Sequence, residues 1–243
     1  MRIGFYVCSA VRHPHNGRES VRLGWAADRQ PHYTFSGHFY TSFAVMGSPD
    51  PGEVHDELLR HYELSQQLSR RAYSGGGPVN LALVVRCLDY STSTALNAMD
   101  GYGQLSEVLL PTAVDSPPMV SDVDEQLILK LFFIEPVNIA YIVLQCDEPP
   151  DDVEASAPKT LHLYVNRPEF DFIEADTVIP HQKIVLDEAT MHQKHPLKAT
   201  KFDRVRSLHV FVVDNLEGVE HTYLNRLTLY GTVQKRYPDK FAI

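Results

Sequence analysis

Short apolar segments with a period of two dominate the C-terminal two thirds of this chain. In LHLYVN at 161–166, leucine and valine at every second position alternate with histidine, tyrosine and asparagine. This period places one set of side chains on a buried face and the other on an exposed face, which is typical of antiparallel sheets. Segments rich in β-branched and aromatic residues occupy 127–133, 137–146, 160–165, 183–186, 208–213 and 223–233. Because no helical pattern separates consecutive strands, the sequence predicts an all-β fold, an antiparallel β-sandwich or jelly roll.

The basic residues divide the chain into two parts. All eight lysines lie at or beyond Lys130, whereas every basic residue before Pro78 is an arginine. The three glycines and the proline at 75–78 favour neither helix nor strand and are typical of a linker. We therefore expect an N-terminal extension, 1–78, that is mobile or loosely docked, followed by a sandwich domain at 79–240.

Residues 53–71 of the extension have the spacing of one amphipathic helix. Acidic residues open the segment, and Arg70 and Arg71 close it, which matches the helix dipole. Its apolar side chains recur at intervals near three or four residues: Val54, Leu58, Tyr62 and Leu68. We expect this helix to pack on the domain that follows, and binding to a partner helix is the alternative. Residues 1–46 show no convincing periodicity, so the extension is predicted to be largely irregular.

The charge balance and the apolar content argue against two classes of partner. The chain carries 22 lysines and arginines against 31 aspartates and glutamates, a net charge of −9. A nucleic-acid-binding module needs a basic face that displaces counterions from phosphates, so no nucleic-acid partner is expected. No apolar run approaches the roughly 18 residues that span a bilayer, so no membrane partner is expected.

The three cysteines are widely separated and form neither a CxxC pair nor a disulfide framework, which favours a reducing compartment. We expect a cytoplasmic location, with the nucleus as a second one. Four arginines and a single acid in the first 27 residues leave a mitochondrial presequence as an alternative. Pro14, Gly17 and Gly24 would interrupt its amphipathic helix, which weakens that alternative.

Catalytic and metal-binding motifs are missing from the sequence. It has no GxSxG turn, Walker loop or GxGxxG fingerprint, and Cys87 and Cys146 lie in apolar segments typical of core cysteines. The HxxH at 192–195 is followed by Pro196, which breaks the helix that would bring its histidines together. The acidic cluster 121–125 offers oxygen ligands for calcium but lacks the rest of an EF-hand loop, so its carboxylates are expected to cap turn amides. We predict a non-enzymatic chain without cofactor or metal.

Three further histidines, His162, His209 and His221, lie in or beside predicted strands. The alternation assigns each of them to the polar face, and none of them is given a function on that basis.

Residues 79–240 resemble the PITH domain family along several stretches in the family's order. SDVDEQLILKLFF at 121–133 is similar to its most recognisable motif, an acidic turn followed by Glu-Gln-Leu-Leu and a strand. Ala95-Leu96-Asn97 resembles its opening Cys-Leu-Asn segment. Further matching stretches are Pro136-Val137, LHLYVNRPEFDFIEAD at 161–176, His195-Pro196-Leu197, KFDRVRSLHVFVVDN at 201–215 and Leu229-Tyr230-Gly231-Thr232.

The resemblance implies a β-sandwich of the galactose-binding-like jelly-roll type, in agreement with the strand pattern. It also implies binding rather than catalysis, because the family's name records an association with the 26S proteasome. We therefore expect a monomeric, non-catalytic protein-interaction module whose partner is the regulatory particle of the 26S proteasome. A carbohydrate- or metal-binding sandwich is the alternative that the fold alone suggests. Residues 1–78 contain no CxxC, so they are not expected to supply the thioredoxin domain that accompanies this module in other family members.

The partner-binding surface is predicted at two places. Interfaces need exposed aromatic or apolar anchors inside a polar rim. Phe170 and Phe172 have acidic neighbours and a spacing that puts both rings on one face of an extended segment. The alternative is that these rings close one end of the sandwich as part of its core. The second place is the acidic turn with Asp122, Asp124 and Glu125, which could meet a basic partner surface.

Overall fold

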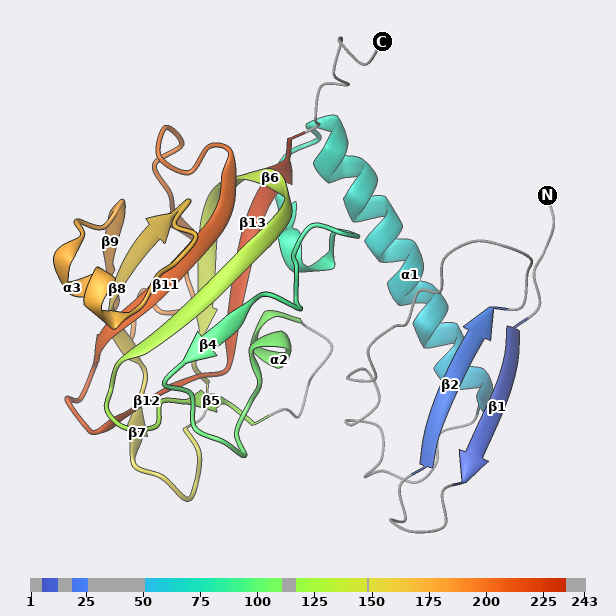
Figure 1. Ribbon diagram of the computed structural model, residues 1–243, viewed down its shortest axis with the longest axis horizontal. Coiled ribbons are helices and arrows are strands. Elements are labelled where there is room, and N and C mark those ends of the chain that lie inside the picture. Colours follow the sequence, from blue (N-terminus) through green and yellow to red (C-terminus); the bar gives the residue numbers. More distant parts are fainter. Residues whose placement is uncertain (1–5, 13–18, 26–50, 111–116, 148, 235–243) are drawn as a thin grey trace. The chain divides into compact units, whose positions relative to one another are not determined.

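The chain folds into two compact units, Met1–Val45 and Met46–Ile243. The computed structural model describes residues 6–12, 19–25, 51–110, 117–147 and 149–234 (Figure 1).

The first unit contains a hairpin that the sequence analysis did not predict. Strand β1 (Tyr6–Arg12) pairs antiparallel with β2 (Glu19–Trp25), so that Arg12 lies opposite Glu19. Apolar and other residues alternate in the second half of β2, but three consecutive large or apolar residues at 6–8 obscure the period in β1. A single unbroken period on both strands would have been needed to recognise the pair.

The second unit is an all-β sandwich, as predicted. Its larger sheet contains β3 (Val79–Asn80), β4 (Thr94–Leu96), β6 (Leu127–Gln145), β8 (Pro158–Val165), β9 (Gln182–Val185), β10 (His195–Pro196), β11 (Val205–Asn215) and β13 (Arg226–Val233). These strands follow the order β3-β13-β6-β11-β8-β9, with β4 and β10 also paired to β6. The smaller sheet has the order β5-β12-β7, formed by Met119–Val120, His221–Leu224 and Ala155–Ser156. Every strand pair of this unit is antiparallel except β12 with β7.

Strand β6 is the long central strand of the larger sheet. The sequence pattern predicts two strands, 127–133 and 137–146, but the chain forms one continuous strand of 19 residues. The first part pairs with β4 and with most of β11, and the part after Pro136 pairs with β13, with β10 and, at Val137, with the start of β11 (Figure 1). Proline is compatible with an extended backbone, so Pro136 lies within the strand without ending it.

The main core lies between the layers and is built from rows of side chains in register. Leu163 of β8, Val210 of β11 and Leu129 of β6 lie opposite one another across three strands, and each is at most 1% exposed. Burying one such side chain stabilises the fold by roughly 1.5–3 kcal/mol. The alternate rows point to the other face of the same sheet, where a second apolar cluster forms.

Helix α1 (Pro51–Ser74) confirms the predicted helix and packs on the sandwich through its C-terminal half. Ala72 is fully buried, the hydroxyl of Ser65 donates to the carbonyl of Leu83 at 2.7 Å, and the amide of Val85 donates to Ser69 Oγ at 2.9 Å. Toward the N-terminus, Tyr62 is 62% exposed. The C-terminal half of α1 is therefore the part that attaches the helix to the sandwich.

The glycine run after α1 is an ordered helix end. Gly75 and Gly77 have φ of 75° and 98°, a left-handed backbone that side chains disfavour. The amide of Gly76 donates to the carbonyl of Arg71, and Arg71 Nε donates back to the carbonyl of Gly76 at 2.8 Å. Whether the sandwich folds without residues 1–78 stays a prediction. Among the described helices, none combines the length and the apolar character that crossing a membrane requires.

Candidate functional site

The side chain of Asn97 makes several of the hydrogen bonds that hold the predicted acidic turn at 121–125. Its Nδ2 donates to Asp124 Oδ1 at 2.8 Å and to the carbonyl of Gln126 at 2.7 Å. Its Oδ1 accepts from the amide of Val123 at 3.0 Å. Asn97 has a φ of 63°, a left-handed conformation that asparagine tolerates. The segments 95–97 and 121–133, which resemble separate motifs in the sequence, therefore form one structural unit.

The three acids of this turn have different surroundings. Asp124 Oδ1 also accepts from the amide of Gln126 at 3.0 Å, so its carboxylate caps turn amides as expected. Glu125 is half-buried, and its carbonyl accepts from the hydroxyl of Thr222 at 2.7 Å. Asp122 is exposed beside Val123, whose side chain is 74% exposed. Asp122, Val123 and Asp124 are the exposed side chains of the turn, and the Asp124 carboxylate also holds the turn. Binding of a partner there stays a prediction.

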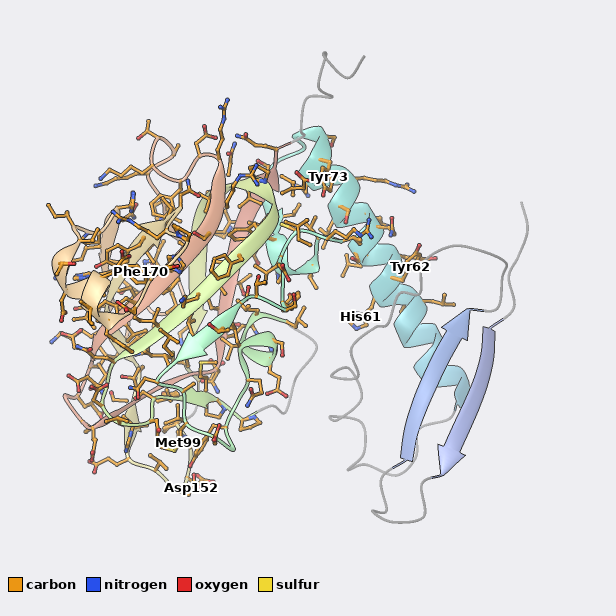
Figure 2. The ribbon with its side chains drawn as sticks, viewed as in Figure 1. His61, Tyr62, Tyr73, Met99, Asp152 and Phe170 are labelled. Carbon is orange, nitrogen blue, oxygen red and sulfur yellow. The ribbon has the colours of Figure 1, made fainter. Side chains whose placement is uncertain are left out.

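Further acids surround this turn because several loops meet at the same end of the sandwich. Figure 2 shows Met99 and Asp152 together at this end. The exposed acids of these loops are Asp100, Asp147, Asp151, Asp152, Glu154, Glu217 and Glu220. Within the residues that the structure describes, no three side chains of His, Cys, Asp or Glu converge as metal ligands.

Phe170 is a core residue, which corrects the prediction of an exposed anchor. Its ring is 2% exposed and lies 4.5 Å from that of Tyr164 and 4.8 Å from that of His209 (Figure 2). Helix α3 (Phe172–Thr177) begins directly afterwards, and Asp171 caps it by accepting the amide of Glu174 at 2.9 Å. The segment is therefore not extended there, as the prediction of two rings on one face required.

Phe172 is half-buried and packs edge-on against Phe211, with centroids 6.0 Å apart. As the first residue of α3 it helps to cover the outer face of the sheet, in agreement with the alternative that these rings belong to the core. The acidic turn precedes β6 at one end of the sheet, whereas Phe170 lies over its face, so the two predicted places do not form one surface.

His209 is buried, although the strand pattern assigns it to a polar face. Its side chain is 0% exposed, and Nε2 donates to the carbonyl of Arg167 at 2.7 Å, while Nδ1 has no hydrogen-bond partner. Burial lowers the pKa of His209 to about 4. Because the α3 segment covers the outer face, both faces of β11 are buried; the nearly unbroken apolar run LHVFVV is the sequence signal for this.

The end of β8 and the start of β11 are joined by side-chain hydrogen bonds, as Asn97 joins 95–97 to the acidic turn. We call both arrangements interlocked turns, and the sequence analysis missed this second one. Asn166 and Arg204 have φ of 57° and 52°, and Asn166 Oδ1 accepts from the amide of Arg206 at 2.7 Å. This arrangement brings Arg167 beside Arg204 and Arg206. The residues are about 40 positions apart in the sequence, so only the antiparallel pairing of β8 with β11 reveals them as neighbours.

The described cysteines are core residues, as predicted. Cys87 and Cys146 are buried, and burial raises the pKa of each thiol to about 12. Both remain protonated near neutral pH, and a protonated thiol is a poor nucleophile.

Comparison with known proteins places this geometry in a family. A model of the PITH domain matches residues 78–242. Thioredoxin-like protein 1 of Schizosaccharomyces pombe is 33% identical over 168 residues, which is 66% of this chain and 55% of that protein. The chain therefore spans about half the length of this relative.

Two solved structures resemble the chain more distantly. The C-terminal domain of a chitobiase from Bacteroides fragilis is 12% identical, with a TM-score of 0.43, over 58% of this chain and 91% of that domain. The module CBM32-3 from a family 31 glycoside hydrolase of Clostridium perfringens is also 12% identical, with a TM-score of 0.37, over 60% of this chain and 96% of its own length. Likeness at this level says nothing about a ligand of this chain.

The match to the PITH domain contains both interlocked turns. It begins at the residue after the glycine run and extends past the last strand, β13. The stretches 95–97, 121–133, 161–176 and 201–215, which resemble the family in sequence, are the ones that build the Asn97 and Asn166 turns. Because the match covers more than half of the chain, the protein belongs to the PITH domain family.

Proposed function

We propose that this protein is a non-catalytic interaction module that associates with the regulatory particle of the 26S proteasome. The observation that carries the proposal is the PITH domain match over residues 78–242. The family's name refers to such an association. The curated relative shares this part of its length, and its remaining part is not represented in the match.

The described side chains support binding rather than catalysis. The two described thiols are buried and protonated, and the most strongly perturbed histidine, His209, lies in the core without access to a substrate. Perturbed groups that act in catalysis lie in clefts, whereas the two thiols and His209 lie in packed interiors. The polar side chains at both ends of the sheet are exposed and held by ordered turns, which suits a preformed protein-binding surface.

Affinity purification of the tagged full chain tests the proposal. Recovery of regulatory-particle subunits at low salt, followed by binding of purified 26S proteasomes to the purified chain, is the expected result. The same preparation is applied to a glycan array, because a carbohydrate-binding module is the competing function for this fold class. Failure to bind purified proteasomes at low salt contradicts the proposal, and specific glycan binding in that case would replace it.

A further inference from the structure

Five cations gather where the loop before β11 meets the turn after β8. We call this surface the basic rim, and its members are Arg167, Lys198, Lys201, Arg204 and Arg206. All are exposed except Arg167, which is half-buried. Three acids, Glu169, Asp171 and Asp203, lie in the same two segments. The rim is thus a local positive surface on a chain whose net charge is −9.

Backbone and side-chain hydrogen bonds hold the rim in place. The amide of Asn166 donates to the carbonyl of Ser207 at 2.9 Å, and the amide of Arg204 donates to Asn138 Oδ1 at 3.1 Å. The amide of Lys198 donates to Gln182 Oε1 at 3.0 Å. The frame uses the backbone amides of Arg204 and Arg206, and both side chains are exposed to a partner.

The acids near the rim neutralise it only in part. Asp203 lies 3.9 Å from Arg204 Nε and accepts a hydrogen bond from Gln234 Nε2 at 2.7 Å. The positive charge of the rim affects His181: its pKa is lowered mainly by burial and further by the nearby charges of Lys201 and Arg167. Lys201 Nζ donates to the carbonyl of His181 at 3.0 Å, which places this lysine directly beside His181.

The acidic loops of the same chain cannot neutralise the rim. They lie at the other end of β8, a strand of eight residues. At about 3.3 Å per residue this is roughly 26 Å, well beyond the Debye length of about 8–10 Å near physiological salt. The two ends of the sandwich therefore act as separate surfaces of opposite sign.

We infer that the basic rim binds an acidic segment of a partner protein. This inference rests on the proposed role as an interaction module and specifies the chemistry of one contact. Arginine and lysine side chains on a fixed frame match carboxylates along an extended segment. A second copy of this chain is the less suitable occupant, because joining opposite ends of identical molecules gives a head-to-tail contact that forms open filaments unless its rotation closes a ring.

A binding measurement with the purified full chain tests the rim directly. Fluorescein-labelled oligoglutamate is the probe, and oligoglutamine of the same length is the uncharged comparison. We expect saturable binding of oligoglutamate that weakens as salt rises, and no binding of oligoglutamine. The double variant Arg204→Glu with Arg206→Glu should weaken binding by about tenfold or more, because it replaces two attractions by two repulsions.

A matched control separates the rim from the effect of net charge. Lys159→Glu with Arg60→Glu makes the same change of charge at exposed positions of β8 and α1 and should leave binding unchanged. If the Arg204 and Arg206 variant fails to fold, Lys198→Glu with Lys201→Glu tests the same surface. Absence of wild-type binding, or equal loss in rim and control variants, overturns the inference.

Sedimentation of the same proteins tests whether a second copy of this chain binds the rim instead. Self-association that depends on concentration and disappears in the rim variant would assign the rim to a second copy and overturn the proposed partner. Recovery of proteasomes by a wild-type chain that does not bind oligoglutamate would remove this inference and leave the proposed function standing.

Discussion

The imidazole of His209 stacks on the ring of Phe170, with centroids 4.8 Å apart and planes 8° apart. This contact joins the middle of β11 to the segment that covers the outer face of the sheet. The carbonyl of Arg167, three residues before Phe170, accepts the only hydrogen bond that the ring makes among the described residues. A protonated His209 would leave a second N–H buried without an acceptor.

Stability should therefore fall with pH below about 6.5. The pKa of His209 is lowered from 6.5 to about 4 in the fold, so between these values the unfolded chain binds a proton that the native chain does not. The contribution is complete above about pH 6.5 and is lost as pH falls toward 4; it amounts to about 3 kcal/mol. Urea unfolding at a series of pH values measures it.

His209→Phe is the matched variant for this measurement, because it keeps the stacked ring and removes the titrating group. Its stability should vary less between pH 6.5 and 4 than that of the wild type. His162 and His181, whose pKa values burial also lowers, account for a remaining slope. An identical slope in the variant and the wild type would show that His209 is not the source.

Phe170→Ser should destabilise the fold by at least about 3 kcal/mol, because it leaves a cavity between Tyr164 and His209. Phe172→Ser should have a smaller effect, since that ring is half-buried. Thermal melting measures both. Ile173→Ser is the control, at 75% exposure, and should stay within about 0.5 kcal/mol of the wild type. Unchanged melting of Phe170→Ser with lost partner binding would restore Phe170 as an anchor.

Asn97→Ala should destabilise the acidic turn by roughly 2–4 kcal/mol, since it removes the hydrogen bonds to 123–126 and places alanine at a φ of 63°. Asn97→Gly loses the same hydrogen bonds but accepts the backbone conformation, so its effect should be smaller. The difference between the two variants, measured by urea unfolding, isolates the backbone contribution. Equal stability of Asn97→Ala and the wild type would contradict the role assigned to this side chain.

Asp122→Lys should weaken binding to purified 26S proteasomes by roughly three- to tenfold if the acidic turn meets a basic partner surface. Its side chain is exposed and takes no part in the Asn97 network, so melting should not change. Asp151→Lys makes the same charge change in a neighbouring loop and serves as the control. Equal weakening by both substitutions would indicate a general effect of charge at this end of the sandwich.

A chain that begins at residue 79 should keep a β-rich circular dichroism spectrum, because every strand of the sandwich lies at or beyond Val79. It should melt at a lower temperature than a chain that begins at residue 51, since α1 no longer packs on β3 and the amide of Val85 loses Ser69. An unfolded spectrum for the shorter chain would move the domain boundary into α1. Limited proteolysis of the full chain near 74–78 is the complementary measurement.

Local alternation is enough to predict the longer strands of the sandwich, although it misses β1 and β2 and divides β6 into two. It predicts less of the site, because the site depends on contacts between distant segments. Asn97 meets 123–126 only after β4 pairs with β6, and Arg204 meets Asn166 only after β11 pairs with β8. The alternation gives the wrong environment for His209, because the α3 segment covers a face of the sheet that the alternation predicts to be exposed.

The long strand β6 also determines how the sandwich can come apart. One uninterrupted strand pairs with β4 and most of β11 before Pro136 and with β13 and β10 after it, so neither group of strands can lose β6 alone. Amide protons in both halves of β6 should then exchange with solvent only through the same global opening. The two groups of strands therefore form a single cooperative unit, although they pair with different parts of β6.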